Sequence, residues 1–148
     1  HVKKPKNPGY QVEVENQLTS EVTQTTEVIE KIDITAIMSL GDVVSGEKIF
    51  KKCAACHSIN KGGKNKIGPA LYNVVGRIVG GVDNYKYSKA LASYGKEWTF
   101  EELNGFLKKP ATYIKGTKMS YAGLRKEKDR ASVIKYLNQK SDSPKPLP

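Results

Sequence analysis

Two cysteines and one histidine stand close together at residues 53–57, in the sequence CAACH. Cys53 and Cys56 are the only cysteines of the chain, and their spacing of three places both thiols on one side of a helical turn. His57 follows directly, so its ring can point across the same space. A cluster of this kind could form a redox disulfide, hold a zinc ion or attach a c-type haem.

The surroundings of this CxxCH motif separate the three alternatives. A thioredoxin-like disulfide needs a βαβ setting, whereas the flanking pattern here is helix and loop. A structural zinc ion needs four ligands, and the one further histidine is the remote His1. A c-type haem uses all three residues, because the thiols add to its two vinyl groups and the imidazole of His57 binds the iron. The motif therefore favours one haem c, attached covalently through Cys53 and Cys56.

A haem iron has a second axial position, and methionine is a usual protein ligand there. The chain has two methionines, Met38 and Met119. Met119 lies in the sequence YIKGTKMSYAG, where Gly116 and Gly123 allow a loop to double back toward the iron. A methionine more often fills a core, which is the role that we expect for Met38. We predict that the metal is bound by His57 and Met119.

The elements that must position these residues are short helices joined by long loops. Asp42 can cap a helix that ends near Cys56. Residues 58–82 are rich in glycine, lysine and asparagine and contain no alternating run long enough for a sheet. A long ordered loop of this kind is unusual unless it wraps something. Further helices are expected at residues 28–40, 88–94, 99–108 and 127–139.

The composition indicates a small basic domain with a buried cofactor. Of 148 residues, 38% are hydrophobic, with three Phe and one Trp, which is a lean supply for a core. Residues 1–40 carry four lysines against six acidic residues, whereas residues 41–148 carry 21 basic against nine acidic residues. A positive field of this size favours an acidic protein surface as partner. Nucleic acid is not expected as a partner, because no helix-turn-helix or ribonucleoprotein motif is visible.

Three parts are expected along the chain: a flexible linker at residues 1–40, one haem domain at 41–140 and a tail at 141–148. The first part is rich in Thr, Gln, Glu and Asn and lacks Phe and Trp, which is typical of a linker. No apolar run approaches the roughly 20 residues that span a bilayer. The longest candidate is the short ITAIM at residues 34–38.

Longer stretches around the motif resemble class I c-type cytochromes, especially the mitochondrial and α-proteobacterial branch. These stretches are GEKIFKKCAACHSINKGGKNKIGPALYNVVGR and SYGKEWTFEELNGFLKKPATYIKGTKMSYAGL, and the resemblance covers residues 41 to about 140. It implies an all-α cytochrome c fold, with three to five short helices and long loops wrapped around one covalently bound haem. It also implies that Gly46 lets the first helix of the domain approach the C-terminal helix closely.

The resemblance also implies roles for individual residues around the haem. Cys53 and Cys56 would form the thioethers, while His57 would be the proximal iron ligand. Met119 would be the distal ligand. The carbonyl of Pro69 would accept a hydrogen bond from the other ring nitrogen of His57 and fix the ring's orientation. Four more residues match positions that surround the haem propionates: Arg77, Tyr87, Trp98 and Thr117.

Three positions depart from the pattern of this branch. Phe106 and Leu91 stand where the branch commonly has a Tyr and an Asn near the haem. We expect fewer polar groups beside Met119, with a changed reduction potential and a changed iron–methionine bond. Ala111 stands where the family often carries a lysine, which removes one charge from the docking face. The lysines that remain as candidates for partner docking are Lys52, Lys64, Lys66, Lys108, Lys109 and Lys118.

The function implied by the resemblance is one-electron transfer rather than enzyme catalysis. We expect a shuttle from a bc1-type quinol:cytochrome c oxidoreductase to a terminal cytochrome c oxidase in aerobic respiration. Both partners would present acidic docking surfaces. An electron-transfer module for a different dehydrogenase or reductase is the alternative, and the sequence does not separate the two. A haem peroxidase is disfavoured, because the only other histidine, His1, lies in the linker.

The extension at residues 1–40 resembles the linker of membrane-tethered α-proteobacterial cytochromes c, whose anchor helix precedes it. We therefore expect a monomer on the periplasmic side of the inner membrane, held there only by an anchor upstream of His1. A flexible chain of this length spans about 35 Å, which lets the haem domain swing between neighbouring complexes. The mitochondrial intermembrane space is the alternative location.

Overall fold

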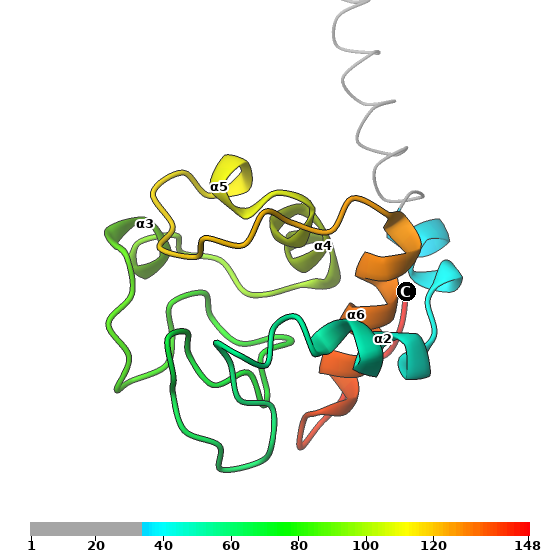
Figure 1. Ribbon diagram of the computed structural model, residues 1–148, viewed down its shortest axis with the longest axis horizontal. Coiled ribbons are helices and arrows are strands. Elements are labelled where there is room, and N and C mark those ends of the chain that lie inside the picture. The colour runs from blue at the N-terminus through cyan, green and yellow to red at the C-terminus, as the bar shows by residue number, and fades with distance from the viewer. Residues whose placement is uncertain (1–33) are drawn as a thin grey trace, which may run out of the picture. The chain divides into compact units, whose positions relative to one another are not determined.

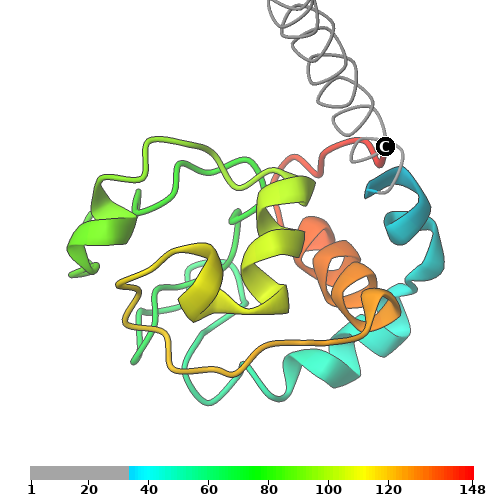
Figure 2. The same ribbon diagram turned by 90° about the horizontal axis from the view of Figure 1, so that it is seen from above.

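The computed structural model describes residues 34–148, and residues 1–33 lie outside the described part. Its helices are α2 (Val43–Phe50), α3 (Lys89–Ala92), α4 (Phe100–Lys108), α5 (Pro110–Tyr113) and α6 (Glu127–Gln139). Within residues 34–148, the one β-type pairing is a single bridge between Ile78 and Glu97. Figures 1 and 2 show α2, α4 and α6 gathered toward one end, with long loops extending away from them. The predicted all-α fold of short helices and long loops is confirmed.

Helix α2 begins at the predicted residue but ends earlier than expected. The Asp42 carboxylate accepts hydrogen bonds from the backbone N–H and the hydroxyl of Ser45, at 2.8 and 2.7 Å. The helix ends at Phe50 rather than near Cys56, because the chain tightens there: the Cys53 N–H donates to the Phe50 carbonyl three residues back. Turns then carry the chain through Cys56 to His57, so the CxxCH motif lies on a turn after α2.

Helix α2 packs directly on α6, and Gly46 makes this contact possible. A Cβ atom at Gly46 would overlap the backbone carbonyl of Ser132 in α6. The Ser132 hydroxyl also accepts a hydrogen bond from the Asp42 N–H at 3.0 Å. The rings of Phe50 and Tyr136 lie 5.6 Å apart between their centroids, which extends the contact along both helices. The close approach that was expected at Gly46 is confirmed.

The other helices follow the predicted ranges closely, with one addition. Thr99 caps α4 by accepting a hydrogen bond from the Glu102 N–H at 3.1 Å, and Ser88 caps α3 in the same way through the Leu91 N–H. The addition is α5, a single turn that starts at Pro110 directly after α4. In the sequence Pro110 indicates the end of the preceding helix, although proline also suits the first turn of a new helix.

Residues 34–40 are helical and contribute to the core. Ile34, Ile37 and Met38 are buried, and Met38 is 1% exposed, which agrees with the predicted core-filling role. The compact unit of the structure thus begins at Ile34, whereas the sequence placed the start of the haem domain at residue 41. The expected linker and the first part of the expected 28–40 helix lie outside the described residues, so the role of that segment stays a prediction.

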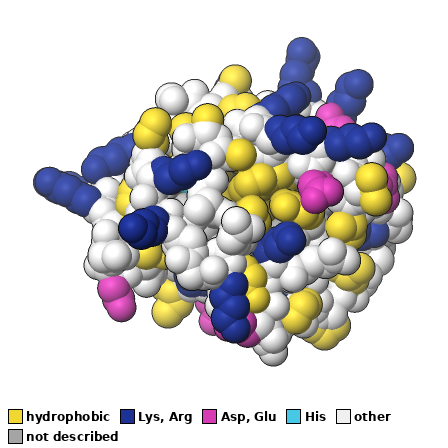
Figure 3. Space-filling view, turned by 60° about the horizontal axis from the view of Figure 1, so that its bottom comes forward, with side chains coloured by type: hydrophobic (Ala, Val, Ile, Leu, Met, Phe, Trp, Pro, Cys, Tyr) yellow, Lys and Arg dark blue, Asp and Glu magenta, His cyan; other side chains and the backbone are white. Residues whose placement is uncertain are grey.

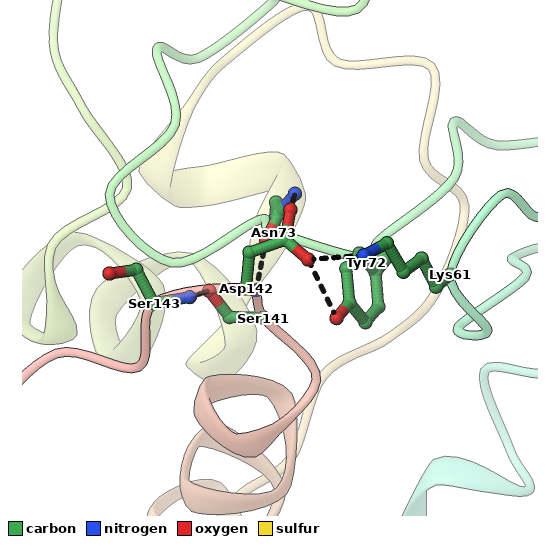
Figure 4. Close-up of polar contacts among 6 residues, drawn as sticks. All are labelled: Lys61, Tyr72, Asn73, Ser141, Asp142 and Ser143. Atoms are coloured by element: carbon green, nitrogen blue, oxygen red, sulfur yellow. Dashed lines mark hydrogen bonds and ion pairs between the residues drawn. The ribbon is translucent and has the colours of Figure 1, made fainter.

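The segment after α6 is fastened to a distant loop. Asp142 receives hydrogen bonds from Tyr72 and Asn73 and forms an ion pair with Lys61 at 3.0 Å. Figure 4 shows these side chains converging from the loop and from the C-terminal segment. We call Lys61, Tyr72, Asn73 and Asp142 the tail clasp. The sequence does not reveal this contact, because Tyr72 and Asn73 lie about 70 residues before Asp142 in the chain.

Candidate cofactor site

A cavity of about 400 Å³ lies among the loops and helices. This volume falls within the roughly 300–1,000 Å³ range that is typical of ligand pockets. Its walls come from several separate segments, so the chain forms the site only when it is folded. The cavity lining includes all nine predicted cofactor-binding residues: Cys53, Cys56, His57, Pro69, Arg77, Tyr87, Trp98, Thr117 and Met119.

Apolar side chains from α4 and α6 form part of the cavity wall. Leu103 and Phe106 contribute from α4, and Val133 and Leu137 contribute from α6. The ring of Phe106 packs against Trp98 with 5.1 Å between centroids. These side chains are buried in the protein, so the cavity offers a dry environment to an apolar ring system. A flat macrocycle with hydrophobic edges fits such a lining.

His57 is held in one orientation within this wall. Its Nδ1 lies 2.7 Å from the Pro69 carbonyl, which can only accept, so Nδ1 carries the proton and Nε2 keeps its lone pair. Gly68 gives the ring its space, because a Cβ atom there would overlap the imidazole. Burial lowers the pKa of His57, which favours the neutral ring that a metal requires. The expected His57–Pro69 contact is present.

The two cysteines are free and half-buried at the cavity wall. Burial raises the pKa of Cys53, which favours the protonated thiol over the thiolate. Within residues 34–148, no three His, Cys, Asp or Glu side chains are grouped so that they could hold a metal ion. A thioredoxin-like βαβ setting is also missing from this range. Thioether attachment is the use of both thiols that agrees with their position.

Arg77 brings a cationic group with unused hydrogen-bonding capacity to the cavity. Its Nη1 donates to the carbonyls of Ala70 and Tyr72, at 3.0 and 3.4 Å. Its Nε is buried and has no protein partner. A buried N–H without an acceptor is costly, and a carboxylate would satisfy both its hydrogen bond and its charge. The haem propionates are such carboxylates, so this orphaned group fits the cofactor that the cysteines indicate.

Met119 reaches the same cavity from the second long loop. It is half-buried, and its backbone N–H donates to the Thr117 hydroxyl at 3.2 Å. Two of the three positions that depart from the family pattern, Leu91 and Phe106, line the cavity as well. Neither side chain can donate a hydrogen bond to a ligand sulfur. The predicted effect of these two positions on the reduction potential and on the iron–methionine bond stays a prediction.

The six candidate docking lysines are all exposed, but only some of them reach the cavity. Lys52 and Lys118 line it, and Lys118 also donates to the Lys86 carbonyl at 3.2 Å. Lys66 donates to the Ala54 carbonyl at 2.9 Å, which holds it beside the CxxCH turn. Figure 3 shows a face on which Lys and Arg side chains surround an apolar area. The other four candidates, Lys64, Lys66, Lys108 and Lys109, do not line the cavity.

Tyr85 and Gly68 are among the lining residues that the sequence did not reveal. Tyr85 packs its ring edge-on against Tyr87 with 4.8 Å between centroids, and its hydroxyl donates to the Ile67 carbonyl at 2.6 Å. Gly68 makes room for the His57 ring, as described above. The YKY pair of residues 85–87 was a visible signal for the first. The GP dipeptide at residues 68–69 gave the turn but not the contact with the imidazole.

Comparison with known proteins agrees with the geometry of the cavity. The family profile described as cytochrome c matches residues 43–141. The chain is 41% identical to a cytochrome c homolog of Bradyrhizobium diazoefficiens, over 99% of this chain and 80% of that protein. It is 46% identical to the cytochrome c of Gibberella zeae, over 68% of this chain and 95% of that protein.

A solved structure shows the same fold. Cytochrome cH from Methylobacterium extorquens matches with a TM-score of 0.63 and 39% identity, over 67% of this chain and 99% of that one. The matched region contains the cavity-lining residues of both long loops. The chain therefore belongs to the cytochrome c family of electron-transfer proteins and carries haem c attached through Cys53 and Cys56.

Proposed function

We propose that this protein carries single electrons between a bc1-type quinol:cytochrome c oxidoreductase and a terminal cytochrome c oxidase, with His57 and Met119 as axial ligands. The observation that supports the ligand pair is that both side chains reach one cavity from two separate loops. When bound, the haem supplies an iron that alternates between Fe(II) and Fe(III). The other axial candidate among the described residues, Met38, is 1% exposed and does not line the cavity.

The chain's own residues keep the iron environment constant during transfer. The Pro69 carbonyl fixes the His57 ring and makes its free nitrogen a better donor to iron. The apolar wall excludes water, so the surroundings reorganise little when the charge of the iron changes. Arg77, whose buried Nε has no protein partner, would provide a fixed cation for the propionates. A site built in this way favours fast transfer without substrate access to the metal.

Docking on both partners would use the basic face around the cavity. Lys52 and Lys118 line the cavity, and Lys66 is held beside the CxxCH turn. Complementary charges mainly speed the encounter, while the small contact area permits rapid release. Residues 64, 108 and 109 would extend this basic face. A carrier that visits two partners in turn needs both properties.

The proposed location is the periplasmic side of the inner membrane. Two relatives, both named cytochrome c homolog, come from the bacteria Bradyrhizobium diazoefficiens and Rickettsia bellii. Among residues 34–148, no helix has the length and apolar character to span a bilayer. A tether would therefore have to involve sequence outside the described part, and cell fractionation of the native protein tests this proposal. Release of the native protein by a salt wash alone would contradict a tether.

Absorption spectra test the proposed ligation. The ferric protein should show the weak long-wavelength charge-transfer band of His/Met coordination, and the ferrous protein should be low-spin. Met119→Leu should abolish the band. Met38→Leu is the matched control, because it removes the buried thioether and should leave the band unchanged. A band that survives Met119→Leu would overturn the proposed distal ligand.

Steady-state oxidation by a terminal oxidase tests the proposed docking. Lys52→Glu and Lys118→Glu should each slow the reaction at low salt, and the difference from the unmutated protein should shrink as salt rises. Lys140→Glu makes the same charge change at the end of α6, where the lysine lies over the Tyr136 ring and away from the cavity lining. Equal slowing by all three variants would contradict a local docking face.

A further inference from the structure

Three side chains meet at the carboxylate of Glu102, in the first turn of α4. Tyr94 and Tyr113 donate hydrogen bonds to the same oxygen, Oε1, at 2.7 and 3.0 Å. The Lys96 ammonium lies 3.7 Å from the other oxygen, Oε2. The Glu102 side chain is only 15% exposed, whereas Lys96 and Tyr113 are exposed. None of the four residues lines the haem cavity.

Tyr113 connects this carboxylate to α5. It is the last residue of α5, a single turn whose N-terminus has no side-chain cap. The Tyr113 ring lies directly on Gly105 of α4, where a Cβ atom would overlap the ring. The hydrogen bond to Glu102 and the ring contact at Gly105 together fasten α5 to α4 from the end that continues toward Met119.

The loop that carries Met119 starts at the residue after Tyr113. Residues 114–123 form no regular helix, and they return to α4 where the Leu124 N–H donates to the Leu107 carbonyl at 2.7 Å. The loop is therefore held on α4 at both of its ends. Between these two ends, the Lys118 ammonium donates an exposed hydrogen bond of 3.2 Å to the Lys86 carbonyl. Stability of the loop depends strongly on its end contacts.

We propose that Glu102 is a positioning residue for Met119. It holds Tyr113 and so fixes the first end of the 114–123 loop, which keeps the Met119 thioether at the iron. This inference rests on the His57/Met119 ligation proposed above. Weakening the Glu102–Tyr113 contact lets the loop open more often, and the sixth coordination position of the iron is then exposed to outside ligands.

Tyr94 offers a matched comparison for this proposal. It donates to the same Glu102 oxygen at a similar distance, but it lies on the segment before α4 and not on the loop. Burial, followed by the bond to Glu102, raises the pKa of each tyrosine. Both phenols therefore stay protonated donors at neutral pH. Replacing either one by phenylalanine removes one hydroxyl from the same acceptor, but only Tyr113 continues into the Met119 loop.

The experiment uses the full haem-loaded chain and measures how fast imidazole binds to the ferric protein. Imidazole can bind only after Met119 leaves the iron, so the rate reports opening of the loop. Tyr113→Phe should raise the rate about fivefold, which corresponds to the loss of one net hydrogen bond. Tyr94→Phe should stay within about twofold of the unmutated protein. Equal rates for the two variants would overturn the positioning role.

A second pair of variants separates positioning from a general loss of stability. In Glu102→Gln the side chain keeps an oxygen that can accept the hydrogen bond from Tyr113. This variant protein should therefore bind imidazole at nearly the original rate. Glu102→Ala removes the acceptor and should match Tyr113→Phe. If the Glu102→Gln protein binds imidazole as fast as the Glu102→Ala protein, the proposal is wrong.

The spectrum of the unmutated ferric protein separates failure of the His57/Met119 ligation from failure of the positioning role of Glu102. Absence of the His/Met charge-transfer band would overturn the ligation itself, and with it this inference. Presence of the band together with equal rates for Tyr113→Phe and Tyr94→Phe would overturn the role of Glu102 alone. The band together with the expected difference in rate supports both.

Discussion

Asn73 and Asp142 exchange two hydrogen bonds although 69 residues separate them in the chain. The Asp142 N–H donates to Asn73 Oδ1 at 2.8 Å, and Asn73 Nδ2 donates to Asp142 Oδ2 at 3.2 Å. The Asn73 N–H also donates to the Lys140 carbonyl at 2.9 Å. This part of the tail clasp joins the end of α6 to the loop that supplies Pro69 and Arg77 to the cavity.

The backbone at Asn73 predicts a specific order of stability among its variants. Its φ of 67° lies in the left-handed region, which glycine adopts without strain and alanine does not. Asn73→Ala loses the side-chain hydrogen bonds and adds this strain, whereas Asn73→Gly loses only the bonds. We expect Asn73→Ala to unfold more easily than Asn73→Gly by about 1 kcal/mol, measured by urea denaturation. The reverse order would contradict the strained backbone.

The clasp also predicts a pH dependence. The hydrogen bond from Lys61, followed by that from Asn73, lowers the pKa of Asp142 below its usual range. A group with a lowered pKa in the folded state stabilises the protein above its unfolded pKa of about 3.9, and this contribution is lost as the pH falls through the folded pKa.

Asp142→Asn should therefore lower the melting temperature at pH 6, and the difference from the unmutated protein should disappear toward pH 2. Thermal melts across this range check the expectation. Asp83→Asn removes an exposed carboxylate outside the clasp and serves as the charge control. If the difference in melting temperature between Asp142→Asn and the unmutated protein were unchanged at pH 2, the charge of Asp142 would not be its cause.

The contact between α2 and α6 predicts a large effect from one added methyl group. Gly46→Ala would push α2 away from the Ser132 carbonyl, because the new Cβ has no space. We expect a loss of about 1–3 kcal/mol in the free energy of unfolding, which urea denaturation measures. Val44→Ala on the same helix removes exposed atoms and should change stability by less than about 0.5 kcal/mol. If Gly46→Ala left the free energy of unfolding unchanged, α2 and α6 could move apart at little cost.

Arg77 predicts a change in the redox chemistry itself. A positive charge near the iron disfavours Fe(III) relative to Fe(II), so its removal should make the protein harder to reduce. Arg77→Gln is expected to lower the reduction potential by tens of millivolts in a spectroelectrochemical titration. Arg125→Gln removes an exposed arginine that does not line the cavity and should shift the potential much less. Equal shifts of the reduction potential in the two variants would mean that the net charge of the protein, and not the position of Arg77, causes the effect.

Local patterns in the sequence carried most of the fold and the cofactor attachment. Asp42 and Thr99 were recognisable as helix caps, because a capping side chain bonds to a residue only a few positions away. The CxxCH motif was equally local. Met119 could be named as a ligand candidate because the chain has only two methionines and one of them lies among glycines.

Contacts between distant segments were the part that the sequence did not reveal. The partner of Asp142 is in a loop 69 residues earlier, and neither side shows a periodic pattern. The hydroxyls of Tyr94 and Tyr113 converge on Glu102 only after α5 forms, and α5 itself is a single turn that a proline boundary concealed. The burial of Ile34, Ile37 and Met38 depended on tertiary packing in the same way, although their helical spacing was visible.

The cavity also has a consequence for how the protein is made. Leu103, Phe106 and Leu137 are buried, yet one side of each faces the space that the cofactor fills. Before attachment, the newly synthesised chain lacks the centre of its own hydrophobic core. Haem attachment to Cys53 and Cys56 therefore completes the hydrophobic core, so the folded state of the chain depends on its cofactor.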